Sequence, residues 1–232
     1  MRYDCHPLGN ARLQSLSESE EALSLLRQQT AILWDFDGVI KDSVAVKTSA
    51  YECLFRSYGP KVANLVVAHH EANGGMSRYE KLPIYLRYAR VNPSETVVAQ
   101  FCDRFATLVV EGVIASPWVP GVREYLMDAH NEQSFALITA TPQCEIELIL
   151  ERLGILRCFR KVYGAPIDKS RAILKTMEEF GFPRNETLMV GDSLSDLKAA
   201  QENDIQFLLR RTSLNKDLSV MNSNPQFEVL PH

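Results

Sequence analysis

Asp35 and Asp37 stand two residues apart, directly after the apolar run at residues 31–34. A carboxylate in this position can attack phosphorus and form an aspartyl-phosphate, which splits one hard displacement into two easier steps. A second carboxylate, followed by a turn at Gly38, can protonate the departing oxygen and later deprotonate the attacking water. The spacing therefore predicts Asp35 as the nucleophile and Asp37 as the acid/base of a phosphoryl-transfer reaction. Because the ordinary pKa of an aspartate is about 3.9, the acid role requires a raised pKa at Asp37.

Three more polar residues follow apolar runs further along the chain. Thr139 follows residues 135–138, and Asp192 and Asp196 follow residues 187–191. The carboxyl ends of parallel strands meet at one edge of a sheet, so we expect these side chains to converge on the first two aspartates. Carboxylates in such number need a cation, and Mg²⁺ prefers oxygen ligands. The sequence therefore predicts Mg²⁺ as the cofactor.

Phosphoryl transfer also needs a fixed cation and hydrogen-bond donors, because negative charge is spread over the equatorial oxygens of the transferred group. Lys169, at the start of a helical segment, is the predicted cation. The hydroxyl and backbone N–H groups at Thr139 and Ala140 are the predicted donors. Each position also has a structural interpretation: Thr139 as an ordinary strand end, Lys169 as a solvated lysine, and Asp196 as a charge favoured in a first helical turn.

The elements that position these residues are strands and helices in alternation. Four apolar runs are continuous, as expected for strands covered on both faces of a parallel sheet. Alternating strands and helices predict an α/β fold. The predicted strands are residues 31–35, 135–139, 187–191 and 205–209, and the predicted helices are residues 121–130, 143–153, 169–180 and 195–203.

A helical module is predicted between the first two strands. A crossover between parallel strands usually takes about 30 residues, yet about a hundred separate Asp35 from Thr139. Residues 44–115 show helical periodicity. We therefore assign residues 44–115 to a small inserted cap, and residues 1–43 and 116–232 to the core.

The two ends of the core are expected to differ. A helix is predicted at residues 17–29, with Ser17 as its N-cap and Glu20 as the capping-box partner. The tail from about residue 212 is rich in asparagine and is expected to be loosely ordered.

Composition and charge limit the partners. The 232 residues include 25 Lys and Arg against 29 Asp and Glu, a net charge of −4, so no broad basic face for nucleic acid is expected. The apolar runs are too short to span a bilayer and the N-terminus lacks a signal-peptide core, which favours a cytoplasmic protein without a membrane partner. The five scattered cysteines form no C-x-x-C pair and are expected to be free thiols. The sequence does not indicate the oligomeric state.

The motifs together resemble those of the haloacid dehalogenase-like (HAD) phosphohydrolases. Asp35-Phe-Asp-Gly-Val39 resembles the first motif, Thr139 the second, Lys169 the third, and Gly191-Asp-Ser-Leu-Ser-Asp196 the fourth. They stand in the family's order and extend over about residues 31–210. The resemblance implies a Rossmann-like core with a helical cap of the C1 type inserted after the first motif.

The resemblance also implies a role for each site residue. Asp35 is implied as nucleophile and Mg²⁺ ligand, and Asp37 as acid/base and as a ligand through its backbone carbonyl. The third motif lacks the Lys-Pro pair of many capped members, and its Asp168 has no implied role. The remaining roles are Asp192 as a Mg²⁺ ligand, Thr139 and Lys169 as phosphoryl binders, and Asp196 as a group outside the ligand set that orients the metal site.

The cap carries a candidate for substrate recognition. Gly75-Met-Ser-Arg78 is similar to the segment with which capped mutases and sugar-phosphate phosphatases reach the distal part of their substrates. Arg78 is therefore expected to bind an anion or sugar hydroxyls. Gly38 and Ala140 are further candidate substrate contacts. The histidine pair at residues 69–70 is expected on a solvated helix face.

The leading hypothesis is a phosphatase that hydrolyses a small phosphorylated metabolite, such as a sugar or sugar-acid phosphate. Val39, in place of the commoner threonine, resembles the β-phosphoglucomutase branch and keeps a phosphomutase as the alternative. A noncatalytic module that binds a phosphorylated ligand is the third hypothesis. It does not explain the full set of aspartates.

Overall fold

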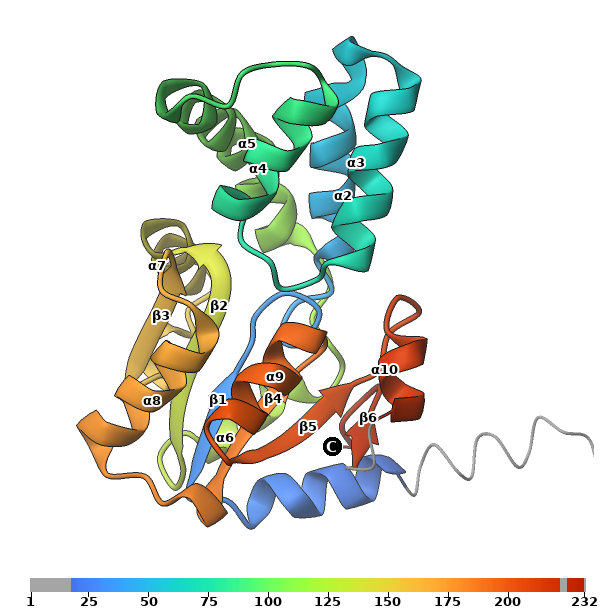
Figure 1. Cartoon of the computed structure of the whole chain (residues 1–232). Helices are drawn as coiled ribbons and strands as arrows, with labels where there is room; N and C mark the ends of the chain where they lie inside the picture. Colours follow the sequence, from blue (N-terminus) through green and yellow to red (C-terminus); the bar gives the residue numbers. More distant parts are fainter. Residues whose placement is uncertain (1–17, 222–224, 232) are drawn as a thin grey trace, which may run out of the picture.

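The computed structural model describes residues 18–221 and 225–231, in which a parallel sheet lies below a group of helices (Figure 1). The strand order is β3-β2-β1-β4-β5-β6, and every neighbouring pair is parallel. The residues that follow β1 are therefore flanked by the ends of β2 and β4. The strands are β1 (Ala31–Trp34), β2 (Ser134–Pro142), β3 (Lys161–Ala165), β4 (Thr187–Gly191), β5 (Gln206–Arg210) and β6 (Gln226–Phe227).

Helices cover both faces of this sheet. The core helices are a helix at residues 18–27, α6 (Val122–Ala129), α7 (Gln143–Arg152), α8 (Lys169–Phe180) and α9 (Leu194–Glu202). Successive side chains of a strand point to opposite faces. In β1, Leu33 packs on the face covered by α8 and α9, whereas Ile32 and Trp34 pack on the face covered by α6, α7 and residues 18–27. Burial on both faces explains why the strands read as continuous apolar runs.

Four helices inserted between β1 and β2 form the cap, which stands over the carboxyl end of the sheet (Figure 1). They are α2 (Val44–Phe55), α3 (Pro60–Ala72), α4 (Arg78–Tyr88) and α5 (Glu95–Ala115). Aromatic side chains hold α2 and α5 together, with the ring centroids of Tyr51 and Phe105 4.1 Å apart. The predicted α/β fold with a helical insertion is confirmed. The boundaries at residues 44 and 115 stay a prediction.

Capping side chains fix the starts of two core helices. Asp168 is the N-cap of α8 and accepts a hydrogen bond from the backbone N–H of Arg171 at 2.9 Å, which gives this aspartate a structural role. At α9, the hydroxyl and the backbone N–H of Ser193 donate to Oδ2 of Asp196 at 2.5 and 3.1 Å. This capping box fixes the side chain of Asp196.

The sequence patterns do not predict β3, β6 or α10 (Lys216–Met221). β3 is a half-buried edge strand and β6 has two residues, so neither carries a continuous apolar run. The segment from residue 212 was expected to be loosely ordered, but the Asn215 amide donates to the carbonyls of Asp192 at 2.7 Å and Arg210 at 2.8 Å. Side-chain hydrogen bonds, which apolar patterns do not reveal, tie the chain at Asn215 to the core.

Ser17 lies outside the described residues, so its predicted capping role stays a prediction. Across residues 18–221 and 225–231, no helix has both the length and the apolar character that crossing a membrane requires. Short 3₁₀ helices complete the connections at η1 (Arg56–Tyr58), η2 (Leu156–Cys158) and η3 (Arg184–Glu186).

Candidate active site

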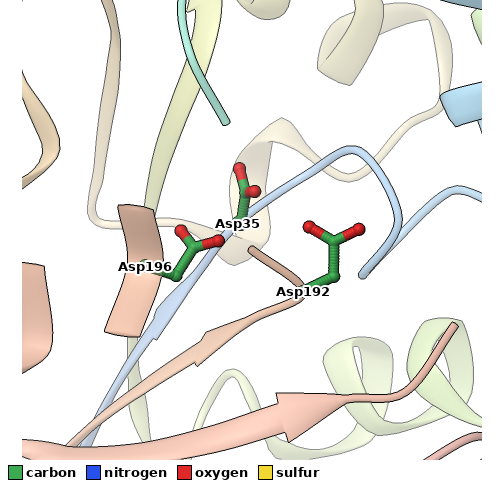
Figure 2. Close-up of side chains that lie close together, drawn as sticks. All are labelled: Asp35, Asp192 and Asp196. Carbon is green, nitrogen blue, oxygen red and sulfur yellow. The ribbon is translucent and has the colours of Figure 1, made fainter. Parts of the chain in front are cut away.

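The carboxyl ends of β1 and β4 bring three aspartates together (Figure 2). Asp35 directly follows β1, Asp192 directly follows β4, and Asp196 lies in the first turn of α9. One carboxylate oxygen from each lies within 4.8 Å of the others. Asp35 and Asp196 are buried and Asp192 is half-buried. The structure thus places three of the four predicted carboxylates in one acidic cluster.

A lysine from α8 lies between two of these carboxylates. Lys169 Nζ is 2.9 Å from Oδ2 of Asp35 and 2.5 Å from Oδ1 of Asp196, and its side chain is buried. Burial alone would lower the pKa of Lys169, but the two carboxylates raise it above its ordinary value. Lys169 is therefore a fixed cation beside Asp35, and its role in binding the phosphoryl group stays a prediction.

One lysine does not neutralise three carboxylates. Burial raises the pKa of Asp35 to about 6 against the effect of Lys169, and the charge of Asp196 adds to the rise. Burial, followed by the charges of Asp35 and Asp196, raises the pKa of Asp192 well above its ordinary value. A hard divalent cation favours the ionised form of such groups, and oxygen is its preferred ligand atom. The acidic cluster therefore fits Mg²⁺.

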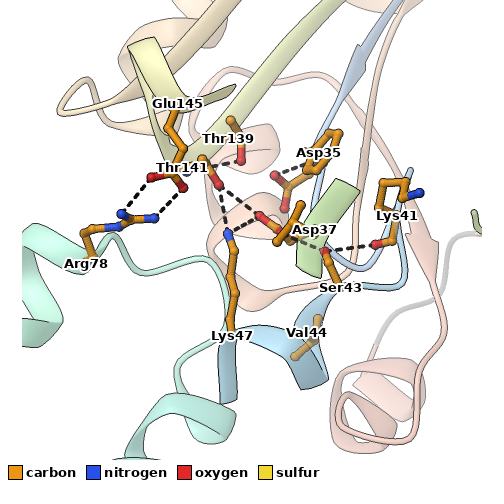
Figure 3. Close-up of polar contacts among 12 residues, drawn as sticks. Asp35, Asp37, Lys41, Ser43, Val44, Lys47, Arg78, Thr139, Thr141 and Glu145 are labelled. Atoms are coloured by element: carbon orange, nitrogen blue, oxygen red, sulfur yellow. Dashed lines mark hydrogen bonds and ion pairs between the residues drawn. The ribbon is translucent and has the colours of Figure 1, made fainter. Parts of the chain in front are cut away.

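The carboxylate of Asp37 belongs to a second polar network (Figure 3). The Ser43 hydroxyl donates to its Oδ1 at 2.6 Å, and the Thr141 hydroxyl donates to its Oδ2 at 3.0 Å. Lys47, from the first turns of α2, forms an ion pair with the same Oδ2 and donates to Thr141 Oγ1 at 2.8 Å. A residue from the cap thus holds the predicted acid/base.

These contacts reverse the pKa shift that the sequence led us to expect. Burial would raise the pKa of Asp37, but the charge of Lys47 and the hydrogen bonds from Lys47, Ser43 and Thr141 lower it below its ordinary value. The expectation of a raised pKa is wrong for this arrangement. Lys47 lies ten residues further along the chain, and no motif marked it as a partner of Asp37.

The other core candidates line the same region. Thr139 is buried in β2, near Asp35 in Figure 3, and its Oγ1 accepts a hydrogen bond from the backbone N–H of Thr141 at 3.3 Å. Ala140 is the next residue of β2 and is half-buried. Gly38 has a φ of 78°, and a Cβ at this position would lie 2.1 Å from Oδ2 of Asp192. Glycine is therefore required where the turn after β1 approaches the fourth motif.

Arg78, the cap candidate, has a partner that the sequence did not reveal. Its Nη1 and Nη2 donate to Oε2 and Oε1 of Glu145 in α7 at 2.8 and 2.6 Å, and both side chains are buried (Figure 3). The loop before α4 packs on the fourth motif, because a Cβ on Gly75 would lie 2.1 Å from Ser195 Oγ. The cap is therefore in direct contact with the core at the site, and substrate binding by Arg78 stays a prediction.

Of the two residues that the sequence analysis missed here, Thr141 could have been identified from its spacing and Glu145 could not. Thr141 stands two residues after Thr139 in β2, so the two share a face of the strand, and this spacing could have identified it. Glu145 lies 67 residues from Arg78, and no local pattern connects them.

The histidine pair of α3 also differs from expectation. His70 was expected on a solvated face, but it is buried, with its ring centroid 4.8 Å from that of Tyr51 and its Nδ1 2.8 Å from Lys81 Nζ. The expectation is wrong for His70 because this side of α3 packs against α2 and α4. His69 is partly exposed.

Comparison with known proteins gives the same family as the motifs. Residues 32–209 match the family described as haloacid dehalogenase-like hydrolase, which is more than half of the chain. A phosphoglycolate phosphatase from Pseudomonas fluorescens is 25% identical over 210 residues, covering 85% of this chain and 75% of the relative.

Solved structures share the fold at low sequence identity. A β-phosphoglucomutase from Clostridium difficile has a TM-score of 0.65 at 17% identity, covering 88% of this chain and 91% of its own. CbbY from Rhodobacter sphaeroides, in complex with xylulose-(1,5)-bisphosphate, has a TM-score of 0.68 at 16% identity. The match covers 87% of this chain and 94% of the CbbY chain. The family match, the capped α/β fold and the acidic cluster agree with one another. The chain belongs to the haloacid dehalogenase-like hydrolase family and is an enzyme of its phosphatase type.

Proposed function

We propose that this enzyme hydrolyses a small phosphomonoester through an aspartyl-phosphate on Asp35. The position of the Asp35 carboxylate carries the proposal: it is buried at the end of β1, 2.9 Å from Lys169 Nζ and in one cluster with Asp192 and Asp196. A nucleophile for phosphorus needs a fixed cation beside it, because the transferred group brings negative charge. The phosphatase name of the curated relative supports the same reaction.

The proposed cofactor is Mg²⁺, with the carboxylates of Asp35 and Asp192 and the backbone carbonyl of Asp37 as its protein ligands. Bound Mg²⁺ would neutralise charge on the phosphoryl oxygens and favour the ionised form of Asp35. Asp196 is better suited to orient the site than to bind the metal, because both of its oxygens are engaged. Oδ1 accepts from Lys169, and Oδ2 accepts from the serine that caps α9.

In the first half-reaction, a carboxylate oxygen of Asp35 attacks phosphorus, and the bond from phosphorus to the leaving oxygen breaks. Asp37 gives its proton to that oxygen. Thr139, Ala140 and Lys169 are the proposed groups that bind the equatorial phosphoryl oxygens. The step needs a protonated Asp37, whereas contact with Lys47 favours the carboxylate. Lys47 is therefore expected to leave Asp37 when the substrate phosphate, a competing anion, enters.

In the second half-reaction, a water attacks the phosphorus of the aspartyl-phosphate. The Asp37 carboxylate takes the proton of this water, and the bond between phosphorus and the Asp35 oxygen breaks to release phosphate. The carboxylate form of Asp37, with hydrogen bonds from Ser43 and Thr141, suits this step. The cap lies against the core here, which supports exclusion of bulk water from the intermediate.

The proposed substrates are short phosphorylated acids and sugars. The curated relative is named for phosphoglycolate, and the CbbY structure holds a sugar bisphosphate. A phosphomutase is the second candidate, because Val39 and the segment Gly75-Met-Ser-Arg78 are similar to those of capped mutases. A mutase would require a bisphosphate activator and release little inorganic phosphate.

A phosphate-release screen with Mg²⁺ over phosphorylated acids, sugars and nucleotides tests the proposal, with Asp35→Asn in parallel. We expect turnover on at least one small substrate and a loss of at least about 10³-fold in kcat for the variant. Normal turnover by Asp35→Asn would show that another group is the nucleophile. Absence of turnover and of Mg²⁺ binding across the panel would favour a noncatalytic module.

A further inference from the structure

A basic pair lies buried in the cap. Lys81 of α4 and His70 of α3 are 2% and 6% exposed, and Lys81 Nζ lies 2.8 Å from His70 Nδ1. Burial, followed by the charge of Lys81, lowers the pKa of His70 to about 3. The imidazole is therefore neutral near pH 7, and its Nδ1 accepts a hydrogen bond from the lysine ammonium.

Among the residues that the structure describes, neither member of this pair has an acidic partner. Within the parts of the chain that the structure describes, no ion pair includes Lys81, and Nε2 of His70 is buried without a hydrogen-bond partner. Burial, followed by the charge of Lys47, lowers the pKa of Lys81 to about 7. A buried cation without a counter-charge is costly. The pair is therefore arranged to meet an anion that the described chain does not supply.

The pair also lies close to the active site. Lys47, Asp37 and Asp192 are among the charges that act on the Lys81 ammonium. Its helix, α4, begins directly after the loop in which Gly75 approaches Ser195 of the fourth motif. Lys81 is thus carried by the part of the cap that contacts the catalytic edge of the sheet.

Two basic groups of the cap that face the core are already paired. Lys47 forms an ion pair with Asp37, and Arg78 forms one with Glu145. Lys81 follows Arg78 by three residues, so the two lie on the same side of α4. Arg78 is held by the core, whereas no ion pair among the described residues includes Lys81.

We propose that Lys81, held in place by His70, binds a carboxylate on the leaving part of the substrate and so selects phosphate esters of small hydroxy acids. This inference rests on the proposed phosphatase reaction and adds the class of substrate. The ammonium donates charge-assisted hydrogen bonds to the carboxylate, and its contact with His70 fixes its direction. An ester without the carboxylate leaves the buried ammonium unpaired and is bound less well.

Three ligands of similar length separate the possibilities: 2-phosphoglycolate, 2-hydroxyethyl phosphate and ethylene glycol bisphosphate. Binding of each to Asp35→Asn with Mg²⁺ is measured by calorimetry, alone and combined with Lys81→Met. The steady-state kinetics of Lys81→Met are measured in parallel in the enzyme that retains Asp35. The binding measurement does not depend on turnover, so failure of the proposed reaction and failure of this inference are distinguishable. Lys61→Met, an exposed lysine of α3, is the matched control.

We expect Asp35→Asn alone to bind 2-phosphoglycolate at least about tenfold more tightly than 2-hydroxyethyl phosphate. Adding Lys81→Met should remove most of that preference. Lys61→Met should preserve it. His70→Gln, which keeps a hydrogen-bond acceptor for Lys81, should retain more of the preference than His70→Ala.

Three results would overturn the inference. The first is equal binding of the carboxylate and the alcohol, or no binding of either. The second is an equal loss for both ligands in Lys81→Met, which would indicate a general structural role. The third is a Lys81-dependent preference that is larger for the bisphosphate, which would replace the carboxylate with a second phosphate.

Discussion

Arg78 of the cap and Glu145 of the core form a buried ion pair with two parallel hydrogen bonds, 2.8 and 2.6 Å long. Removing one member of a buried pair leaves the other charge uncompensated. A second pair, Arg152 with Glu111, also joins the core helix α7 to the cap helix α5, but it is exposed. The core helix α7 therefore pairs with the cap once through buried and once through exposed side chains, and the two contributions can be compared.

Glu145→Gln should loosen the contact between cap and core. The amide keeps the size of the side chain but removes the charge, so Arg78 stays buried without a full partner. We expect a Tm lower by several degrees and a KM raised more than kcat is lowered, because the closed cap is needed to hold the substrate. Thermal melting and steady-state kinetics measure both.

Glu111→Gln is the control for this prediction. The side chain of Glu111 is 73% exposed, and exposed ion pairs contribute little. We expect a change in KM within about twofold. Equal effects of the two substitutions would mean that the Arg78–Glu145 pair has no special role in cap closure.

Asp192→Asn should reveal the metal site through stability. The pKa of Asp192 is higher in the folded protein than in the unfolded chain. Its contribution to the free energy of unfolding therefore falls as the pH rises from the ordinary pKa through the raised one. At neutral pH without Mg²⁺ the amide variant should therefore melt above the unsubstituted protein. Adding Mg²⁺ should raise the Tm of the unsubstituted protein and leave the variant nearly unchanged. If the variant melts below the unsubstituted protein in EDTA, the Asp192 carboxylate is not destabilised by burial and by the charges of Asp35 and Asp196.

Gly38→Ala should disturb the acidic cluster through a steric clash. A Cβ at residue 38 would lie 2.1 Å from Oδ2 of Asp192, and the φ of 78° is unfavourable for alanine. We expect weaker Mg²⁺ binding and a loss of about tenfold or more in kcat/KM. Gly181→Ala is the matched control, since its φ is also positive, 67°, but nothing lies within 4 Å of its added Cβ. This control should lose stability and keep its Mg²⁺ affinity, and equal loss of affinity in both would exclude the clash as the cause.

Local patterns predicted the elements whose signals are local. The predicted bounds of β4 and α8 agree with the structure, because each is a compact apolar or periodic run closed by glycine. β3 was not predicted, since an edge strand with half-buried residues has no such run. The insertion was visible as an interval too long for one crossover and as the helical periodicity of residues 44–115.

The site was predictable where residues follow strand ends. Asp35, Asp192 and Asp196 converge because parallel strands end at one edge. Lys47 and Glu145 were not predictable, because their roles depend on how the cap sits on the core, and this contact has no periodic signature. The error on the pKa of Asp37 has the same origin: its sign is set by Lys47 from the cap.

Lys81 should make the protein more stable as the pH rises above neutrality, and Lys81→Met should remove this dependence. Its folded-state pKa is lowered to about 7, below the ordinary value of 10.5. Between these values the unfolded chain binds more protons at this residue, so this group's contribution to the free energy of unfolding increases as the pH rises. His70, with a pKa of about 3, stays neutral throughout this interval.

Lys81→Met replaces the buried ammonium with an apolar side chain of similar length, so without substrate it should melt several degrees above the unsubstituted protein near pH 6.5. The difference should shrink steadily from about pH 7 toward pH 10, because the folded lysine is then largely neutral and protonation of the unfolded chain becomes less favourable as the pH rises. Melting curves at half-unit pH steps measure it, with Lys61→Met expected to follow the unsubstituted protein. A Lys81→Met variant that melts lower at every pH would show that Lys81 stabilises the cap, and the argument for a ligand-directed cation would then fail.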